Sequence, residues 1–187
     1  VVDGTFTMND NASVSGNNAT STDGGVGVYT STSTATFTMN GGTIRGNNAT
    51  KGGGVGVYRA AKFEMNGGTI SDNTANQGGG VYVESGTFDM NDGTITGNTA
   101  TKGNGGGIYI HFNAGNVSIS NATITDNKAT ATGNTSYGHG GGIYSQRGVT
   151  VKNVTITGNN STYEGGGIYG KGAITLTDAT VADNSGY

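Results

Sequence analysis

The sequence predicts an all-β fold, a right-handed parallel β-helix of about seven coils with three short strands in each coil. Three observations predict it: an asparagine that recurs every 25 to 32 residues, short runs in which apolar and polar residues alternate, and glycine clusters between those runs. The recurring residues are Asn17, Asn47, Asn73, Asn98, Asn127, Asn159 and Asn184. A unit of this size cannot bury its apolar face alone, so the units must stack on a shared core.

The clearest unit spans residues 78–98. Three glycines at 78–80 predict a corner, and strands are expected at 81–83, 87–91 and 94–96. Leucine-rich repeats would need leucine columns, and propeller blades would need about 40 residues and four strands. A triangular β-helix therefore suits the unit best.

Composition excludes several other classes of protein. The 187 residues include 38 Gly but no Pro, Cys or Trp, and no Gly-X-Y period is present, which excludes collagen. The net charge is −3 and the nine Lys and Arg are scattered, so we expect no nucleic-acid partner. No long apolar run is present, so we expect this segment not to insert into a membrane.

The alternation in each run separates a core side from an outer side. The second run places its core residues in two columns, and the third run has one. These columns are Phe6, Phe37, Phe63, Phe88, Val117, Val149 and Ile174; Met8, Met39, Met65, Met90, Ile119, Val151 and Leu176; and Val14, Ile44, Ile70, Ile95, Ile124, Ile156 and Val181. In the first run a tyrosine alternates with buried aliphatics, so six tyrosines are expected to form a stacked external column. They are Tyr29, Tyr58, Tyr82, Tyr109, Tyr144 and Tyr169.

The recurring asparagine ends the third run, where its amide can bond to the turn and to the asparagines of adjacent coils. We therefore expect an asparagine ladder. A small residue follows two positions later, which indicates tight packing at a corner. These residues are Ala19, Ala49, Ala75, Ala100, Ala129, Ser161 and Gly186.

Two short motifs resemble those of a known class of repeat. Gly-Gly-Gly-Ile/Val and Phe-x-x-Asn, the latter from Phe6 to Asn9, Phe37 to Asn40, Phe63 to Asn66 and Phe88 to Asn91, resemble the paired motifs of polymorphic outer-membrane protein repeats. The last three units lack the second motif, so the resemblance is to bacterial surface β-helix repeats in general. It implies an autotransporter-type adhesin passenger at the cell surface, with no catalytic residue.

Catalytic chemistry has little support in the sequence. Asp and Glu mostly fall one per coil in turns, the histidines His111 and His139 stand alone, and no Gly-x-Ser-x-Gly elbow occurs. We therefore expect an extracellular, non-catalytic surface module, an adhesin passenger or a structural stalk, without cofactor or metal. The alternative is a carbohydrate-binding or polysaccharide-degrading β-helix, since pectate lyases have a similar fold.

The third run also suggests a less favoured alternative. Thr94-x-Thr96, Thr123-x-Thr125 and Thr155-x-Thr157 would stack into flat rows that resemble the ice-binding face of β-solenoid antifreeze proteins. Arg45 and Ala182 interrupt one row, and threonine is also simply a good strand residue.

The ligand-binding residues are predicted at the corner where the loops are longest. Residues 128–139 and 160–164 follow the recurring asparagine in consecutive coils, so their tips should lie close together. Tyr137, His139, Tyr163 and Glu164 are the expected contacts for a protein or glycan on a host or neighbouring cell.

Residues 1–187 are expected to form one repeat domain that is a segment of a longer protein. The sequence opens in the middle of a unit and stops just before another glycine cluster would be due. Bare strand edges at the two end coils would favour end-to-end self-association.

Overall fold

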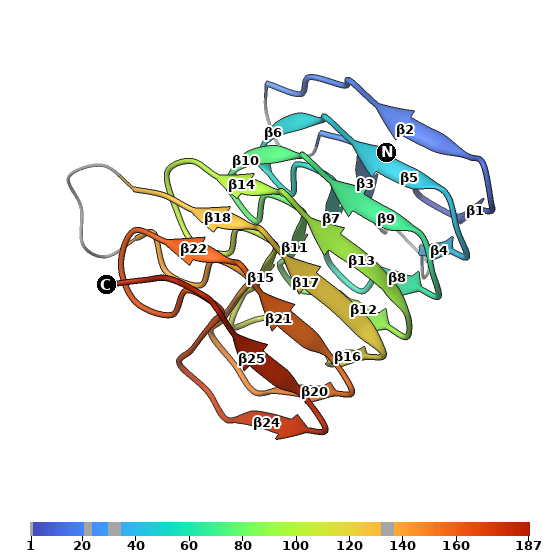
Figure 1. The fold of residues 1–187 in the computed structure, drawn as a ribbon. Coiled ribbons are helices and arrows are strands. Elements are labelled where there is room, and N and C mark those ends of the chain that lie inside the picture. The colour runs from blue at the N-terminus through green and yellow to red at the C-terminus, as the bar shows by residue number, and fades with distance from the viewer. Residues whose placement is uncertain (1, 21–23, 30–34, 132–136) are drawn as a thin grey trace.

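A computed structural model describes residues 2–20, 24–29, 35–131 and 137–187. The chain winds through four parallel sheets, and each strand pairs with the equivalent strand of the neighbouring coils (Figure 1). This confirms the predicted parallel β-helix. About six turns are present rather than about seven, because only two of the four sheets have a strand from every unit.

The sheets are named here by their side chains. The phenylalanine sheet contains β1 (Thr5–Met8), β4 (Thr36–Met39), β8 (Lys62–Met65), β12 (Thr87–Met90), β16 (Val117–Ser120), β20 (Val149–Lys152) and β24 (Ile174–Thr177). The threonine sheet contains β2 (Ser13–Ser15), β5 (Thr43–Arg45), β9 (Thr69–Ser71), β13 (Gly93–Thr96), β17 (Ala122–Thr125), β21 (Thr155–Thr157) and β25 (Thr180–Ala182).

The other two sheets are smaller. The tyrosine sheet contains β3 (Val26–Val28), β7 (Val55–Val57), β11 (Val81–Val83), β15 (Ile108–Ile110), β19 (Ile143–Ser145) and β23 (Ile168–Gly170). The short sheet contains β6 (Asn48–Lys51), β10 (Thr74–Gln77), β14 (Thr99–Ala100), β18 (Lys128–Ala129) and β22 (Asn160–Ser161).

The short sheet corrects the expectation of three strands per coil. The sequence predicts a corner at the small residue after each asparagine, but in five coils this residue lies within a short fourth strand: Ala49, Ala75, Ala100, Ala129 and Ser161. Ala75, Ala100 and Ala129 are at most 1% exposed there. Because these side chains are small, the strand can lie close to the rest of the coil. A larger side chain would hold the strand away from it.

The core is built from the predicted columns. Residues of the same column pair across coils, as in Phe63 with Phe88 and Ile95 with Ile124. The phenylalanine rings stack with centroids 4.8 Å apart for Phe37–Phe63 and 4.9 Å apart for Phe63–Phe88. Because the rings repeat at the coil spacing, the strand register and the ring stack reinforce each other.

The predicted asparagine ladder is present along the whole solenoid. Each amide nitrogen donates to the amide oxygen of the next coil, as from Asn73 to Asn98 at 3.0 Å and from Asn98 to Asn127 at 3.0 Å. The same oxygen also accepts the backbone N–H of the preceding asparagine. Asn73, Asn98, Asn127 and Asn159 are fully buried, so these bonds satisfy polar groups that water cannot reach.

Close approach of successive coils explains the glycine clusters. A Cβ built on Gly79 would lie 2.5 Å from the carbonyl oxygen of Gly106 and 2.6 Å from the backbone of Thr99. A side chain at this corner would push neighbouring coils apart, so glycine is required by space.

Candidate functional site

The loop corner brings the predicted contact residues together. Tyr163 donates its backbone N–H to the carbonyl oxygen of Gly138 at 3.1 Å, so the two loops lie side by side in consecutive coils. The His139 ring lies 5.9 Å from the Tyr163 ring, and its Nδ1 lies 3.8 Å from a carboxylate oxygen of Glu164. Tyr137 is 39% exposed. The remainder of the longer loop, residues 132–136, falls outside the described residues.

His139 is buried, which corrects its predicted role as a surface contact. It is 9% exposed and stacks on Tyr169 with ring centroids 4.6 Å apart. Its Nδ1 accepts the backbone N–H of Glu164 at 3.3 Å, while the backbone N–H of His139 donates to Asn104 Oδ1 at 2.9 Å. His139 therefore supports the corner, and Tyr137, Tyr163 and Glu164 provide its accessible side chains.

The tyrosine column is stacked as predicted but is not external. Tyr82 and Tyr144 are 2% exposed, and Tyr109 is 5% exposed. The chain turns back over these rings just before β11, β15, β19 and β23, so that a Cβ on Gly78 would lie 2.9 Å from Tyr82 Cβ. Lys51 and His139 occupy equivalent places before such turns and lie over the rings of Tyr82 and Tyr169 in the following coils. The alternation along each strand indicates that the tyrosines point away from the aliphatic core, but it does not indicate that another part of the chain covers them.

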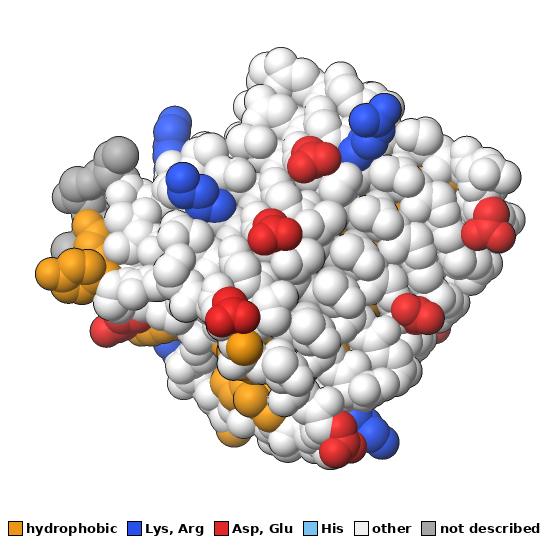
Figure 2. Space-filling view, viewed as in Figure 1, with side chains coloured by type: hydrophobic (Ala, Val, Ile, Leu, Met, Phe, Trp, Pro, Cys, Tyr) orange, Lys and Arg blue, Asp and Glu red, His pale blue; other side chains and the backbone are white. Residues whose placement is uncertain are grey.

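The outer face of the threonine sheet carries two rows of hydroxyl side chains. Thr94 pairs with Thr69 and Thr123, and the register continues without a break from β2 to β25. Figure 2, in which this sheet faces the viewer, shows mainly side chains that are neither charged nor hydrophobic over these strands. Arg45 interrupts one row between Ser15 and Ser71.

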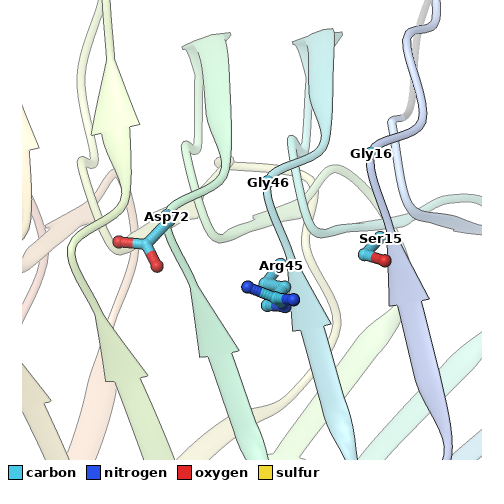
Figure 3. A pocket seen from close by; sticks show the side chains of 5 residues that line it. All are labelled: Ser15, Gly16, Arg45, Gly46 and Asp72. Carbon is cyan, nitrogen blue, oxygen red and sulfur yellow. The ribbon is translucent and has the colours of Figure 1, made fainter.

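A shallow hollow of about 300 Å³ lies beside Arg45, at the end of β2, β5 and β9. Ser15, Gly16, Arg45, Gly46 and Asp72 line it (Figure 3). A Cβ built on Gly16 or Gly46 would meet no atom within 4 Å, so the space above both glycines is free. Among the residues with described positions, none forms a hydrogen bond or ion pair with the Arg45 guanidinium.

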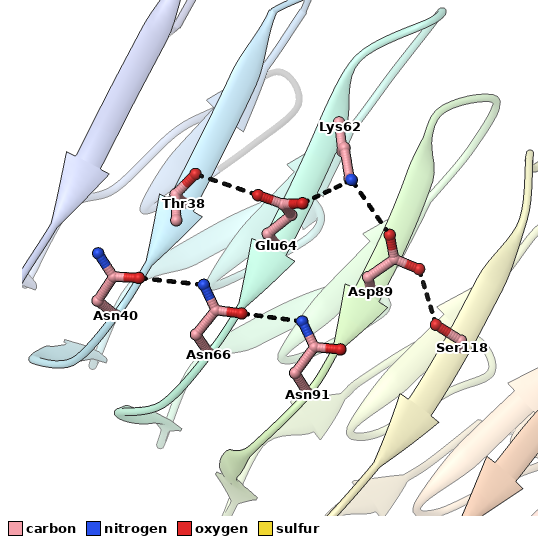
Figure 4. A network of polar contacts seen from close by, with 8 residues as sticks. All are labelled: Thr38, Asn40, Lys62, Glu64, Asn66, Asp89, Asn91 and Ser118. Carbon is pink, nitrogen blue, oxygen red and sulfur yellow. Dashed lines mark hydrogen bonds and ion pairs between the residues drawn. The ribbon is translucent and has the colours of Figure 1, made fainter.

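A polar network lies on the outer face of the phenylalanine sheet (Figure 4). Glu64 and Asp89 occupy paired positions on β8 and β12, and the Lys62 ammonium contacts both carboxylates, at 3.4 Å for Asp89. Ser118 donates its hydroxyl to Asp89 at 2.7 Å. The hydrogen bond to Glu64 is the main cause of a raised pKa for Lys62, with Asp89 adding to it. One lysine thus pairs with both carboxylates and offsets one of their two charges, an arrangement unlike a free acid–base pair.

A second asparagine ladder follows the phenylalanine sheet in the same view. Asn66 donates to Asn40 at 3.0 Å, and Asn91 donates to Asn66 at 2.8 Å. These are the asparagines of the Phe-x-x-Asn motif, and they are exposed. The motif therefore has a structural role, because its phenylalanine and asparagine each form a stack along the solenoid.

No metal site or membrane span is evident within the part of the chain that the structure describes. It has no group of three or more His, Cys, Asp or Glu that could hold a metal ion. It also has no helix of the length and hydropathy needed to cross a membrane.

Residues 5–187 match a family described as "Right handed beta helix region". The chain belongs to this right-handed β-helix family. No match was found among curated proteins or among solved structures.

Two surface residues of this right-handed β-helix were missed as candidate site residues. Phe112 is 63% exposed and stands next to His111, whose pKa is lowered mainly by burial. Its signal in the sequence was weak, because one aromatic residue in a loop has no column to stand out from. Arg45 stands out in the sequence only as a break in a threonine row. A stronger signal for a site is that Arg45 precedes Gly46 and that the preceding coil also has a glycine, Gly16, at this corner.

Proposed function

We propose that this right-handed β-helix is a non-catalytic extracellular surface module, an adhesin passenger or structural stalk of the bacterial autotransporter type, that contacts a protein or glycan on another cell. The observation that carries the proposal is the loop corner. Tyr137, Tyr163 and Glu164 gather there at one edge of the solenoid, while the adjoining sheets present regular rows of side chains. Aromatic residues with a polar group suit both protein and carbohydrate surfaces.

The carboxylates of the outer faces also favour a non-catalytic role. Glu64 and Asp89 occupy paired positions on β8 and β12, and Lys62 and Ser118 already engage them. A polysaccharide-degrading enzyme needs a carboxyl group that can reach the substrate and exchange a proton with it. Carbohydrate binding without cleavage remains the alternative form of the same proposal.

The test is attachment of the purified chain to cells and to immobilised glycans. Tyr137→Ala with Tyr163→Ala should weaken attachment at least several-fold while leaving the melting temperature nearly unchanged, because both side chains are partly exposed. Phe112→Ala is the matched control, since it removes an exposed aromatic residue elsewhere and should leave attachment intact. Attachment that survives the double substitution would refute the loop-corner assignment.

Catalysis is tested in parallel on acidic and neutral polysaccharides. The proposal expects no new reducing ends and no unsaturated products absorbing in the ultraviolet. Turnover that Glu64→Gln or Asp89→Asn abolishes would replace the proposed role with a polysaccharide-degrading one.

Ice binding is a second candidate because the threonine sheet keeps its register across seven strands. Rows at the strand spacing of about 4.8 Å form a regular array of hydroxyl groups, which Arg45 interrupts in one row. The expected result is thermal hysteresis that Thr96→Lys with Thr125→Lys abolishes and Thr150→Lys, on the phenylalanine sheet, does not. Absence of hysteresis in the unmodified chain would eliminate this candidate.

A further inference from the structure

The corner between the threonine sheet and the short sheet has one left-handed residue in every coil. These residues are Gly16, Gly46, Asp72, Gly97, Asp126, Gly158 and Asp183. Glycine and aspartate are both tolerated at this conformation, and the aspartates have φ of 55°, 56° and 54°. Every coil therefore turns in the same way, whether or not it carries a carboxylate.

Each aspartate followed by a glycine in this column leans over that glycine. A Cβ on Gly97 would lie 2.6 Å from Asp72 Oδ1, and a Cβ on Gly158 would collide with Asp126 Oδ1. The space above those two glycines is thus filled by a carboxylate of the preceding coil. Gly46 differs because the preceding coil has Gly16, and nothing lies within 4 Å of the place a Cβ would take.

Gly46, the corner glycine that lacks a carboxylate above it, directly follows a cation. Arg45 precedes Gly46, where Ser71, Thr96, Thr125 and Thr157 stand in the four following coils. Its neighbours in the row, Ser15 and Ser71, are too short to cover a guanidinium. Asp72 lines the same hollow, but its carboxylate leans toward Gly97, away from Arg45 (Figure 3).

From these observations we infer that the hollow binds the carboxylate of a small polyhydroxy ligand, a sugar acid. Its carboxylate takes the place over Gly46 that Asp72 occupies over Gly97, and the Arg45 guanidinium donates to it. The Ser15 hydroxyl, which also lines the hollow, suits a hydroxyl group of the ligand. A volume of about 300 Å³ is at the lower end for small-molecule sites. The site is separate from the loop corner and does not depend on the function proposed above.

The experiment is a titration of the isotope-labelled chain with glucuronate, acetate and glucose, followed by the backbone amide signals of residues 16 and 46 and the Arg45 Nε–H signal. Saturable shifts are expected with glucuronate, weaker binding with acetate and no saturable shift with glucose. Glucose binding as tight as glucuronate would overturn the carboxylate site, and acetate binding as tight would overturn the sugar acid. No saturable shift with glucuronate would also overturn the inference.

Two substitutions test the geometry. Arg45→Thr restores the hydroxyl row and should weaken glucuronate binding by about tenfold or more, because it removes a charge-assisted hydrogen bond. Lys152→Thr is the control, since it removes one positive charge from an exposed position on another sheet and should leave binding unchanged.

Gly16→Asp is the sharper test, because it supplies the missing carboxylate from within the chain. Aspartate is already accepted at this φ in three other coils, so the variant should fold and melt at or above the temperature of the unmodified chain. It should also abolish glucuronate binding by occupying the place over Gly46. Undiminished binding in folded Gly16→Asp would overturn the inference.

Discussion

Asn98 shows how much a single residue contributes to this solenoid. Its amide nitrogen donates to Asn127 Oδ1 and to the Ile70 carbonyl at 2.9 Å, while its amide oxygen accepts the Asn73 backbone N–H at 3.0 Å. The side chain is fully buried. Its removal would take hydrogen bonds from the coil on each side, in a place that water does not reach.

Asn98→Ala should therefore lower the free energy of unfolding by about 2–4 kcal/mol. Asn66→Ala, in the exposed ladder, should cost less than about 1 kcal/mol because water can replace the lost amide. Urea unfolding followed by circular dichroism measures both. Equal losses for the two variants would mean that burial does not set the value of these ladders.

Ile95 provides the same kind of comparison for the apolar core. Ile95→Asp would bury an unpaired charge at a fully buried position and should cost about 4 kcal/mol or more. Val181 stands in the same column in the last coil, is 42% exposed, and should tolerate Val181→Asp at a cost of about 1 kcal/mol or less. Thermal melts of the two variants decide it, and similar melting temperatures would contradict the core assignment.

At the scale of the sheets, the tyrosine sheet departs most from what its sequence indicated. Its strands are buried on both faces, since every residue of β7, β11 and β15 is buried. Tyr82 and Tyr109 stack with centroids 4.8 Å apart, and burial raises the pKa of both phenols well above the usual value of tyrosine. In the folded chain these phenols therefore stay protonated at pH values at which an exposed tyrosine would ionise.

Alkaline pH should destabilise the protein through these rings. The unfolded chain loses its tyrosine protons near pH 10, while the folded chain keeps those of Tyr82 and Tyr109 to higher pH. The stabilising effect of this difference is complete below pH 10 and declines as pH rises beyond it. The free energy of unfolding should fall above pH 10, and less so in Tyr109→Phe. A loss of stability with the same pH dependence in Tyr109→Phe would contradict this role for Tyr109.

The columns were predictable because each depends on two features of the sequence, the period of two within a run and the recurrence of the asparagine. The Phe37–Phe63–Phe88 stack and the ladder through Asn98 follow from these two periods alone. The short sheet was not predictable, because strands as brief as Thr99–Ala100 show no alternation. The covering of Tyr82 and the burial of His139 depend on how the chain turns back before each strand, and no local pattern specifies that path.

The candidate sites show the same division. Sequence spacing was enough to place Tyr137 and Tyr163 at one corner, because both follow the recurring asparagine of their coils. It was not enough to single out Arg45, since the hollow depends on where Asp72 directs its carboxylate and on what is missing above Gly46. In a repeat protein of this kind, a candidate site is indicated where two neighbouring columns of residues both depart from their usual residue, as at Arg45 and Gly16.

For the molecule as a whole, stability should vary along the solenoid axis, because each coil contacts only its neighbours. Opening an interior coil breaks the ladder bonds, ring stacks and strand pairs on both of its sides, whereas opening an end coil breaks them on one side. In the second core column the exposed fraction rises at the β24 end: Met90 is fully buried in β12 and Met8 is 2% exposed in β1, while Leu176 is 47% exposed in β24. Amide hydrogen exchange followed by mass spectrometry should therefore be slowest in β8, β12 and β16 and faster in β1 and β24.

Ile95→Asp should speed exchange most in its own coil and the two adjacent coils, with a smaller effect in β1 and β24. Exchange at one rate throughout, in the unmodified chain and in the variant, would mean that the solenoid opens only as a single unit.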